Sequence, residues 1–154
     1  GLAINPDTSM PEWSKKFIST LDQVIVMSVV PGKSGQKYIE NTHEKTKNLM
    51  SSLKENNFTG YIEADGGVTL DNIGQCFADG ARAFVGGSAI IGQTDVRLVI
   101  REFRNQVLRT RRKLLIQKAN ELGGTELVNK WIDLHVLGKK KDELTQIATE
   151  LGYQ

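Results

Sequence analysis

The sequence predicts an α/β fold built on a parallel sheet, and three observations carry this prediction. Short apolar segments rich in β-branched residues alternate with amphipathic helical segments along residues 1–105, as in parallel sheets with helical crossovers. The segment 24–30 is apolar apart from Ser28 and rich in β-branched residues, which is typical of a strand buried on both faces. Two further strands run directly into glycines, as strands do where a tight turn leads to a helix.

The first strand and helix have clear boundaries. The predicted strand 2–4 ends where Pro6 and Asp7 interrupt the extended chain. Pro11 then stands in the first turn of a predicted helix, where its missing N–H costs no hydrogen bond. We expect this helix to pack on the sheet through Phe17, Ile18 and Leu21.

The later elements continue the alternation. Thr69 is a plausible N-cap for the third helix, and Gly80 suits the position just after its end. The second helix is long and amphipathic, with Ile39, Leu49, Met50 and Leu53 facing inward. The predicted strands are 24–30, 61–65 and 83–87, and the predicted helices are 38–56, 72–79 and a long one from Val96 to Leu122.

Two glycine turns define the candidate site. The strand 61–65 ends on Asp65 followed by Gly66 and Gly67, and the strand 83–87 runs into Gly87 and Ser88. Glycines let backbone N–H groups approach a ligand closely, and a following helix N-terminus attracts phosphate. The repeated pattern suggests the phosphate corner after strands seven and eight of a (β/α)8 barrel, with Asp65 pointing into the same cavity as an acid or base. The alternative is that both are merely tight strand–helix turns.

The composition is that of a soluble globular protein, with 39% hydrophobic and 25% charged residues. No apolar run is long enough to cross a membrane, and no basic-then-apolar leader is present. The single Cys76 excludes an internal disulfide framework, fits a cytoplasmic location and is expected to be a small buried filler. The chain begins at Gly1 rather than Met, which raises the possibility of a processed product or a fragment.

The loop around Lys33 and the histidine His43 each invite a functional reading, but a structural one fits both better. Gly32-Lys33-Ser34 resembles part of a nucleotide-binding P-loop, but Met27 stands where that motif has a glycine. A mobile lid with hinges at Gly32 and Gly35 fits this loop better. His43 lies on the polar side of its helix without a second His or Cys at metal-ligand spacing, so a solvated side chain is expected.

Five motifs follow one another along residues 1–105: Asn5-Pro6, Val26-Met27-Ser28-Val29 with Pro31-Gly32 and Gly35-Gln36, Ile62 to Val68, Gly80-Ala81, and Gly87-Ser88-Ala89-Ile90. In order and spacing they resemble the ribulose-phosphate 3-epimerase family. The resemblance implies the last four βα units of a TIM-type (β/α)8 barrel, followed by a basic helical extension over 106–154. Such a barrel needs about 250 residues when closed, and four parallel strands alone leave two unpaired edges.

The resemblance also implies a reaction, the interconversion of D-ribulose 5-phosphate and D-xylulose 5-phosphate. In this family two aspartates transfer protons on opposite faces of C3, through an enediolate that a divalent metal, usually zinc, stabilises. Asp65 matches the second aspartate, which is also a metal ligand, and Met27 matches a methionine beside the reacting carbons. The substrate-covering loop is matched by Gly32, Lys33, Ser34 and Gly35, and the phosphate site by Gly66, Gly67, Gly87 and Ser88.

The chain also departs from the family pattern. Val30, Lys33 and Ser34 replace the usual Asn, Phe and Gly of the loop, so another phosphorylated ketose is possible as the substrate. The first aspartate, the two metal-binding histidines and a substrate-binding serine belong to early strands that nothing here matches. Three explanations are open: a fragment of a longer epimerase, which we favour; a half-barrel completed by another chain, as in a homo-oligomer; or a relative that binds without catalysing.

The C-terminal segment differs from the rest in charge. Residues 96–154 hold 12 of the 20 Lys and Arg but 7 of the 18 Asp and Glu. The segment 142–153 is similar to the first helix and turn of a helix-turn-helix DNA reader, and the basic run at 109–113 suits phosphate backbones. Short basic helices are more often packing or oligomer-forming elements, which we favour over DNA binding. The alternative function is a non-catalytic phosphosugar-binding or regulatory module with this helix-turn-helix-like tail.

Overall fold

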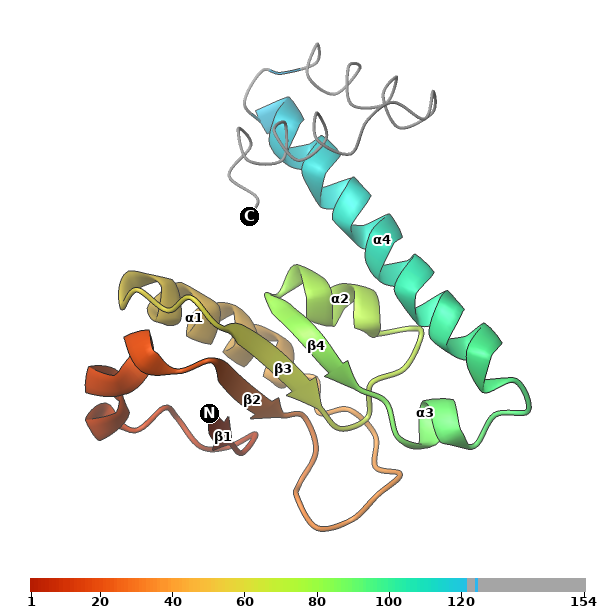
Figure 1. Ribbon diagram of the computed structural model, residues 1–154, viewed down its shortest axis with the longest axis horizontal. Helices are drawn as coiled ribbons and strands as arrows, with labels where there is room; N and C mark the ends of the chain where they lie inside the picture. The colour runs from red at the N-terminus through yellow and green to blue at the C-terminus, as the bar shows by residue number, and fades with distance from the viewer. Residues whose placement is uncertain (122–123, 125–154) are drawn as a thin grey trace. The chain divides into compact units, whose positions relative to one another are not determined.

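The computed structural model describes residues 1–121 and residue 124, and it places four parallel strands in one sheet (Figure 1). The strands follow in the order β1-β2-β3-β4, so neighbours in sequence are neighbours in the sheet. This is the predicted α/β architecture, and it is consistent with part of a TIM-type fold. The strands are β1 (Leu2–Ile4), β2 (Gln23–Met27), β3 (Tyr61–Asp65) and β4 (Ala81–Val85), and the helices are the 3-10 helix η1 (Glu12–Thr20), α1 (Thr42–Glu55), α2 (Ile73–Ala78), α3 (Ser88–Ile91) and α4 (Val96–Glu121).

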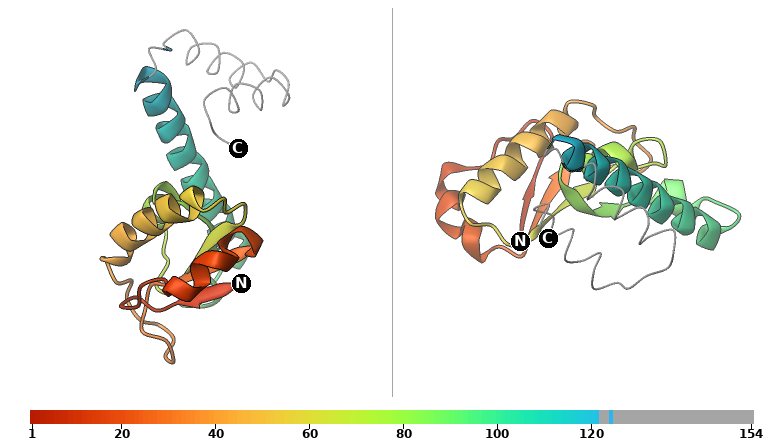
Figure 2. Two further views of the ribbon diagram at one scale, coloured as in Figure 1. Left: turned by 90° about the vertical axis from the view of Figure 1, so that its left-hand side faces the viewer. Right: turned by 90° about the horizontal axis from the view of Figure 1, so that it is seen from above.

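The core lies on one face of the sheet. Side chains alternate between the faces of a strand, and burial alternates with them along β2 and β3. Helix α1 contacts β2 and α2, and α2 contacts β4, so these helices lie together along the sheet (Figures 1 and 2). The buried cluster includes Ile4, Ile18, Val24, Val26, Leu49, Leu53, Ile62, Ala64, Ile73, Cys76 and Phe103.

All four predicted strands are present, although two of them are shifted. β4 begins and ends two residues earlier than expected, and β2 ends at Met27 rather than at residue 30. Ser28 follows the end of β2 and is bound to the turn after β3: its N–H donates to the Asp65 carbonyl (2.7 Å) and its Oγ–H to the Gly66 carbonyl (2.6 Å). The apolar run 24–30 therefore extends three residues beyond the end of β2.

The helices required larger corrections. α1 begins at Thr42 rather than at residue 38, and Asn72 rather than Thr69 precedes α2 as its N-cap residue. The expected packing of Phe17 on the sheet is wrong, since its side chain is 46% exposed and Lys16 Nζ lies 5.0 Å from its ring centroid. Gly80 follows α2 with φ 120°, as predicted for a glycine just past a helix end.

Cys76 is buried within the core, as predicted, at 1% exposure. Burial raises the pKa of its thiol, so the reactive thiolate is scarce at neutral pH. We expect iodoacetamide to alkylate Cys76 at least about tenfold more slowly in the folded chain than in urea at pH 8. Mass spectrometry of timed samples measures both rates, and equal rates would contradict this packing.

The chain divides into two compact units, residues 1–110 and 111–154, and the sheet belongs to the first. α4 extends to Glu121, close to the predicted end at Leu122. The helix-turn-helix-like segment and the other helices predicted after residue 124 lie outside the described residues. Within the described part, none of the helices combines the length and apolar character that a membrane span requires.

Candidate functional site

The carboxyl ends of β3 and β4 and the loop after β2 meet around one open cleft of about 710 Å³. The cleft brings together four of the predicted site residues, because parallel strands present their carboxyl ends at the same edge. Gly35, Gly67, Gly87 and Ser88 line it, whereas Met27, Gly32, Lys33, Ser34, Asp65 and Gly66 do not. Asp65 is therefore not among the residues that line the cavity into which it was predicted to point.

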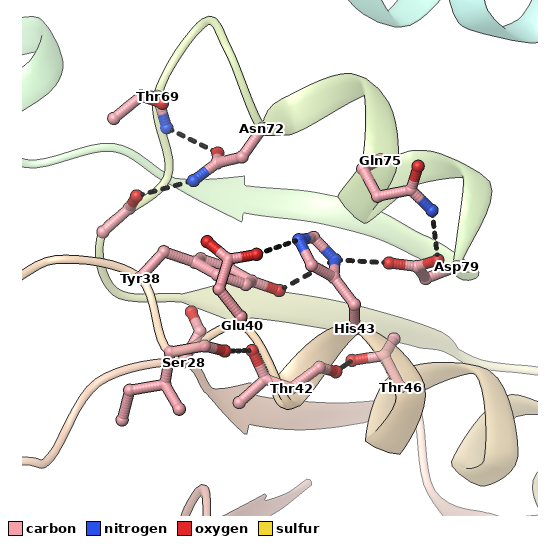
Figure 3. Close-up of polar contacts among 12 residues, drawn as sticks. Ser28, Tyr38, Glu40, Thr42, His43, Thr46, Thr69, Asn72, Gln75 and Asp79 are labelled. Carbon is pink, nitrogen blue, oxygen red and sulfur yellow. Dashed lines mark hydrogen bonds and ion pairs between the residues drawn. The ribbon is translucent and has the colours of Figure 1, made fainter.

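The turn after β3 is fixed by side-chain hydrogen bonds. Asn72 Nδ2 donates to the Gly67 carbonyl (3.0 Å), and Asn72 Oδ1 accepts from the Thr69 N–H (2.8 Å), as Figure 3 shows. Gly67 has φ 64°, and a Cβ added there would lie 2.5 Å from the backbone nitrogen of Tyr38. Glycine is therefore needed both for the turn and for the close approach of the loop that follows β2.

The second turn offers backbone donors. Gly87 precedes α3, and its carbonyl accepts from the N–H groups of Ile90 and Ile91. The N–H groups of Ser88 and Ala89 start the helix, so they have no acceptor within it. α3 has only four residues, so any attraction for an anion comes from these individual amides rather than from a long helix dipole.

Asp65 ends β3 on the sheet face opposite the core. It pairs in register with Met27 of β2 and with Val85 of β4, while the flanking Ala64 is buried among the helices. The other carboxylate of β3 on this face is Glu63, whose Oε2 accepts from Gln23 Nε2 at 2.6 Å. Asp65 and Met27 thus lie side by side at the edge that also carries the glycine turns; their roles in a reaction remain predictions.

The loop after β2 has two glycines with positive φ, Gly32 at 108° and Gly35 at 73°. The Gln36 side chain bridges the loop by donating to the carbonyls of Val30 (2.6 Å) and Lys33 (2.8 Å). Lys33 and Ser34 are exposed. Contact between these two side chains and a ligand in the cleft would require the loop to fold over it.

The prediction that His43 is solvated is wrong. Its side chain is 17% exposed, its Nδ1 lies 2.6 Å from Asp79 Oδ2, and its ring stacks on Tyr38 with 4.6 Å between the ring centroids (Figure 3). Burial raises the pKa of the Tyr38 phenol, so this ring remains neutral. Local periodicity could not reveal the cluster, because its carboxylate comes from a residue 36 positions away.

The predicted metal site is not completed by the residues that the structure describes. Asp65 remains the predicted ligand, but no three His, Cys, Asp or Glu side chains in this part of the chain are close enough together to hold a metal ion. A tetrahedral zinc site with fewer than three protein ligands would be unusual. These residues alone therefore do not form a metal centre.

Comparison with known proteins matches residues 1–91 to the model of the ribulose-phosphate 3 epimerase family. The ribulose-phosphate 3-epimerase of Escherichia coli (strain K12) is 39% identical over 107 residues, which are 70% of this chain and 47% of that protein. Those of Buchnera aphidicola subsp. Schizaphis graminum and Aquifex aeolicus (strain VF5) are both 35% identical over 70% of this chain, covering 46% and 48% of their own lengths. The chain spans about half the length of the curated relatives it matches.

Proposed function

The chain belongs to the ribulose-phosphate 3-epimerase family, and on this premise we propose that it supplies the phosphate-binding half of a C3 epimerase acting on a pentulose 5-phosphate. One observation carries the proposal. Gly67, Gly87 and Ser88 line one cleft at the same strand edge as Asp65. An acid–base residue and anion-binding amides at one edge fit a substrate with a phosphate at one end and a reacting carbon at the other.

In the proposed complex, the cleft holds the phosphate through backbone amides. The amides of Ser88 and Ala89 lack intrahelical acceptors, and the Gly67 turn is held in place by Asn72. A phosphate does not react in an epimerisation, so its binding energy can be used to orient C3.

Asp65 has the chemical role of a proton carrier. Its carboxylate takes the proton from C3 and leaves an enediolate, and a second acid returns a proton to the opposite face of the carbon, which inverts it. The family resemblance assigns that second acid to an aspartate of the first barrel half. A divalent metal, zinc by the same resemblance, would act as a Lewis acid for the enediolate oxygens. Asp65 would be this chain's contribution to its ligands.

The first half of a (β/α)8 barrel is the proposed partner of this sheet. β1 and β4 are the edges of the described sheet, each paired on one side only. The face that carries Asp65 also presents Ile25 and Met27, which are only partly buried. Unpaired edges and a half-covered apolar face are stabilised when a second half-sheet closes the barrel, whether it lies in the same polypeptide or in a partner chain.

A non-catalytic phosphosugar-binding module is the second candidate function. It is favoured by the position of Asp65, which is not among the residues that line the cleft with Gly67, Gly87 and Ser88. Binding without turnover would then need no second half-barrel.

The decisive experiment uses the full product of the gene. Conversion of D-ribulose 5-phosphate to D-xylulose 5-phosphate, and exchange of the C3 hydrogen with solvent deuterium, are measured with and without added zinc. Epimerisation accompanied by exchange supports the enzyme. Saturable binding of the sugar phosphate, with no exchange of the C3 hydrogen in the presence or absence of zinc, would instead support the non-catalytic binding module.

A further inference from the structure

A buried carboxylate holds a histidine at the wall of the phosphate cleft. The Asp79 side chain is fully buried, and its two oxygens contact His43 Nδ1 (2.6 Å), Gln75 Nε2 (2.8 Å) and Lys47 Nζ (3.4 Å). A buried carboxylate is costly unless donors surround it, and here three donors do so. The position of the His43 ring is therefore determined by a well-satisfied anchor, and Figure 3 shows the ring between Asp79 and Glu40.

The contact with Asp79 determines the tautomer of His43. An ionised carboxylate can only accept hydrogen bonds, so Nδ1 carries the hydrogen at 2.6 Å from Oδ2. Nε2 then has a lone pair when the imidazole is neutral and an N–H when it is protonated. Only the protonated ring can donate to an anion from Nε2.

Nε2 is available to a ligand. The Glu40 carboxylate lies 3.9 Å from it, which is beyond hydrogen-bond distance, and the Glu40 side chain is 86% exposed. The described residues provide Nε2 with no hydrogen-bond acceptor. A bound anion could replace Glu40 at this nitrogen at little cost, because an exposed ion pair of this length contributes little.

His43 lines the same cleft as Gly67, Gly87 and Ser88. We infer that His43, oriented by Asp79, is an anion-binding residue of this cleft, which donates from Nε2 as an imidazolium and so couples binding of the phosphate group to uptake of one proton. This inference rests on the proposed function, and it adds a side-chain cation and a pH dependence to a site otherwise made of backbone amides.

The charged groups around the ring are of both signs. Asp79 places a carboxylate oxygen 2.6 Å from Nδ1, and Glu40 places one 3.9 Å from Nε2 on the solvent side. Lys47 contacts Asp79 from the next turn of α1, and Lys37 and Asp71 line the cleft. Tyr38 and Cys76 face the cluster as neutral groups, because burial raises the pKa of both. Deprotonation of His43 would place a lone pair against the anion, so binding weakens as pH rises.

Calorimetric titration of the whole chain with sulfate tests the inference. Sulfate is a tetrahedral dianion that carries no proton between pH 5.5 and 8.5. Any proton taken up on binding is therefore taken up by the protein. Titrations in two buffers with different ionisation enthalpies count the protons. We expect uptake of up to one proton and an affinity that falls by up to about tenfold per pH unit once the imidazole deprotonates.

Two variants complete the test. His43→Gln should bind sulfate about tenfold more weakly at pH 6, with no proton uptake and a flat pH profile. Glu40→Gln, which removes the competing carboxylate, should bind more tightly and keep the proton uptake. Thermal unfolding checks that both variants are folded; if His43→Gln is not, the proton count of the unaltered chain decides alone.

The outcomes separate the two proposals. If the unaltered chain binds neither sulfate nor inorganic phosphate, the phosphate cleft and the role of His43 both fail. If it binds without proton uptake, or if His43→Gln keeps the same pH profile, only the role of His43 fails and the cleft stands.

Discussion

Replacement of Asp65 by Asn is expected to slow C3 epimerisation by the full gene product by about 10²–10⁴-fold, the range associated with loss of a general acid–base group. An amide can neither accept the C3 proton nor return it. The affinity for the sugar phosphate should stay within about threefold, because the phosphate is held in the cleft, which Asp65 does not line.

The structure explains why this variant should fold. The fold uses Asp65 through its backbone: its carbonyl accepts from both the N–H and the Oγ–H of Ser28, and Asn retains that carbonyl. Glu63→Gln provides a matched control, since Glu63 is the other carboxylate of β3 on the same face and pairs with Gln23. We expect that control to lose less than about tenfold in rate. Equal losses in the two variants would show that charge on this face, rather than Asp65 chemistry, supports the rate.

The part of the fold that sequence could predict is the part determined by local composition. The bounds of Tyr61–Asp65 were predicted correctly, because this segment is followed directly by two glycines with positive φ, Gly66 and Gly67, which end the strand. The end of β2 was missed for the opposite reason. Val29 continues the apolar run, yet it leaves the strand to pack under Gly66, where an added Cβ would lie 2.3 Å from Val29 Cγ2. That contact joins two loops and leaves no local signature.

Some residues of the candidate site likewise have a local sequence signal, and others do not. Gly67, Gly87 and Ser88 could be identified because each lies within three residues of the end of a strand, and the carboxyl ends of parallel strands share an edge. His43 and Asp79 could not be paired, since one begins α1 and the other follows α2. Asp79 had the pattern of an ordinary exposed residue before a helix-ending glycine. Only the packing of α1 against α2 reveals that it is a buried anchor.

Gly67→Ala is expected to lower the free energy of unfolding by about 3 kcal/mol and to weaken sulfate binding by about tenfold or more. Two effects add. The left-handed conformation at φ 64° costs an alanine about 1–2 kcal/mol, and the new Cβ would lie 2.5 Å from the Tyr38 nitrogen and 2.8 Å from its Cα. Backbone atoms cannot rotate away as a side chain would. The segment carrying Tyr38 must therefore move, and this movement alters the cleft.

Gly35→Ala separates the two effects. Gly35 has a similar φ of 73°, but a Cβ there meets nothing within 4 Å, so this variant should lose only the conformational cost of about 1–2 kcal/mol. Urea unfolding of both variants gives the difference, which measures how tightly the turn after β3 packs on the loop after β2. Equal destabilisation of the two variants would mean that the loop after β2 moves aside at little cost. The backbone amides of the cleft would then not be preorganised for a ligand. A larger loss at Gly67, accompanied by weaker sulfate binding, would instead show that one backbone contact holds both the fold and the anion site together.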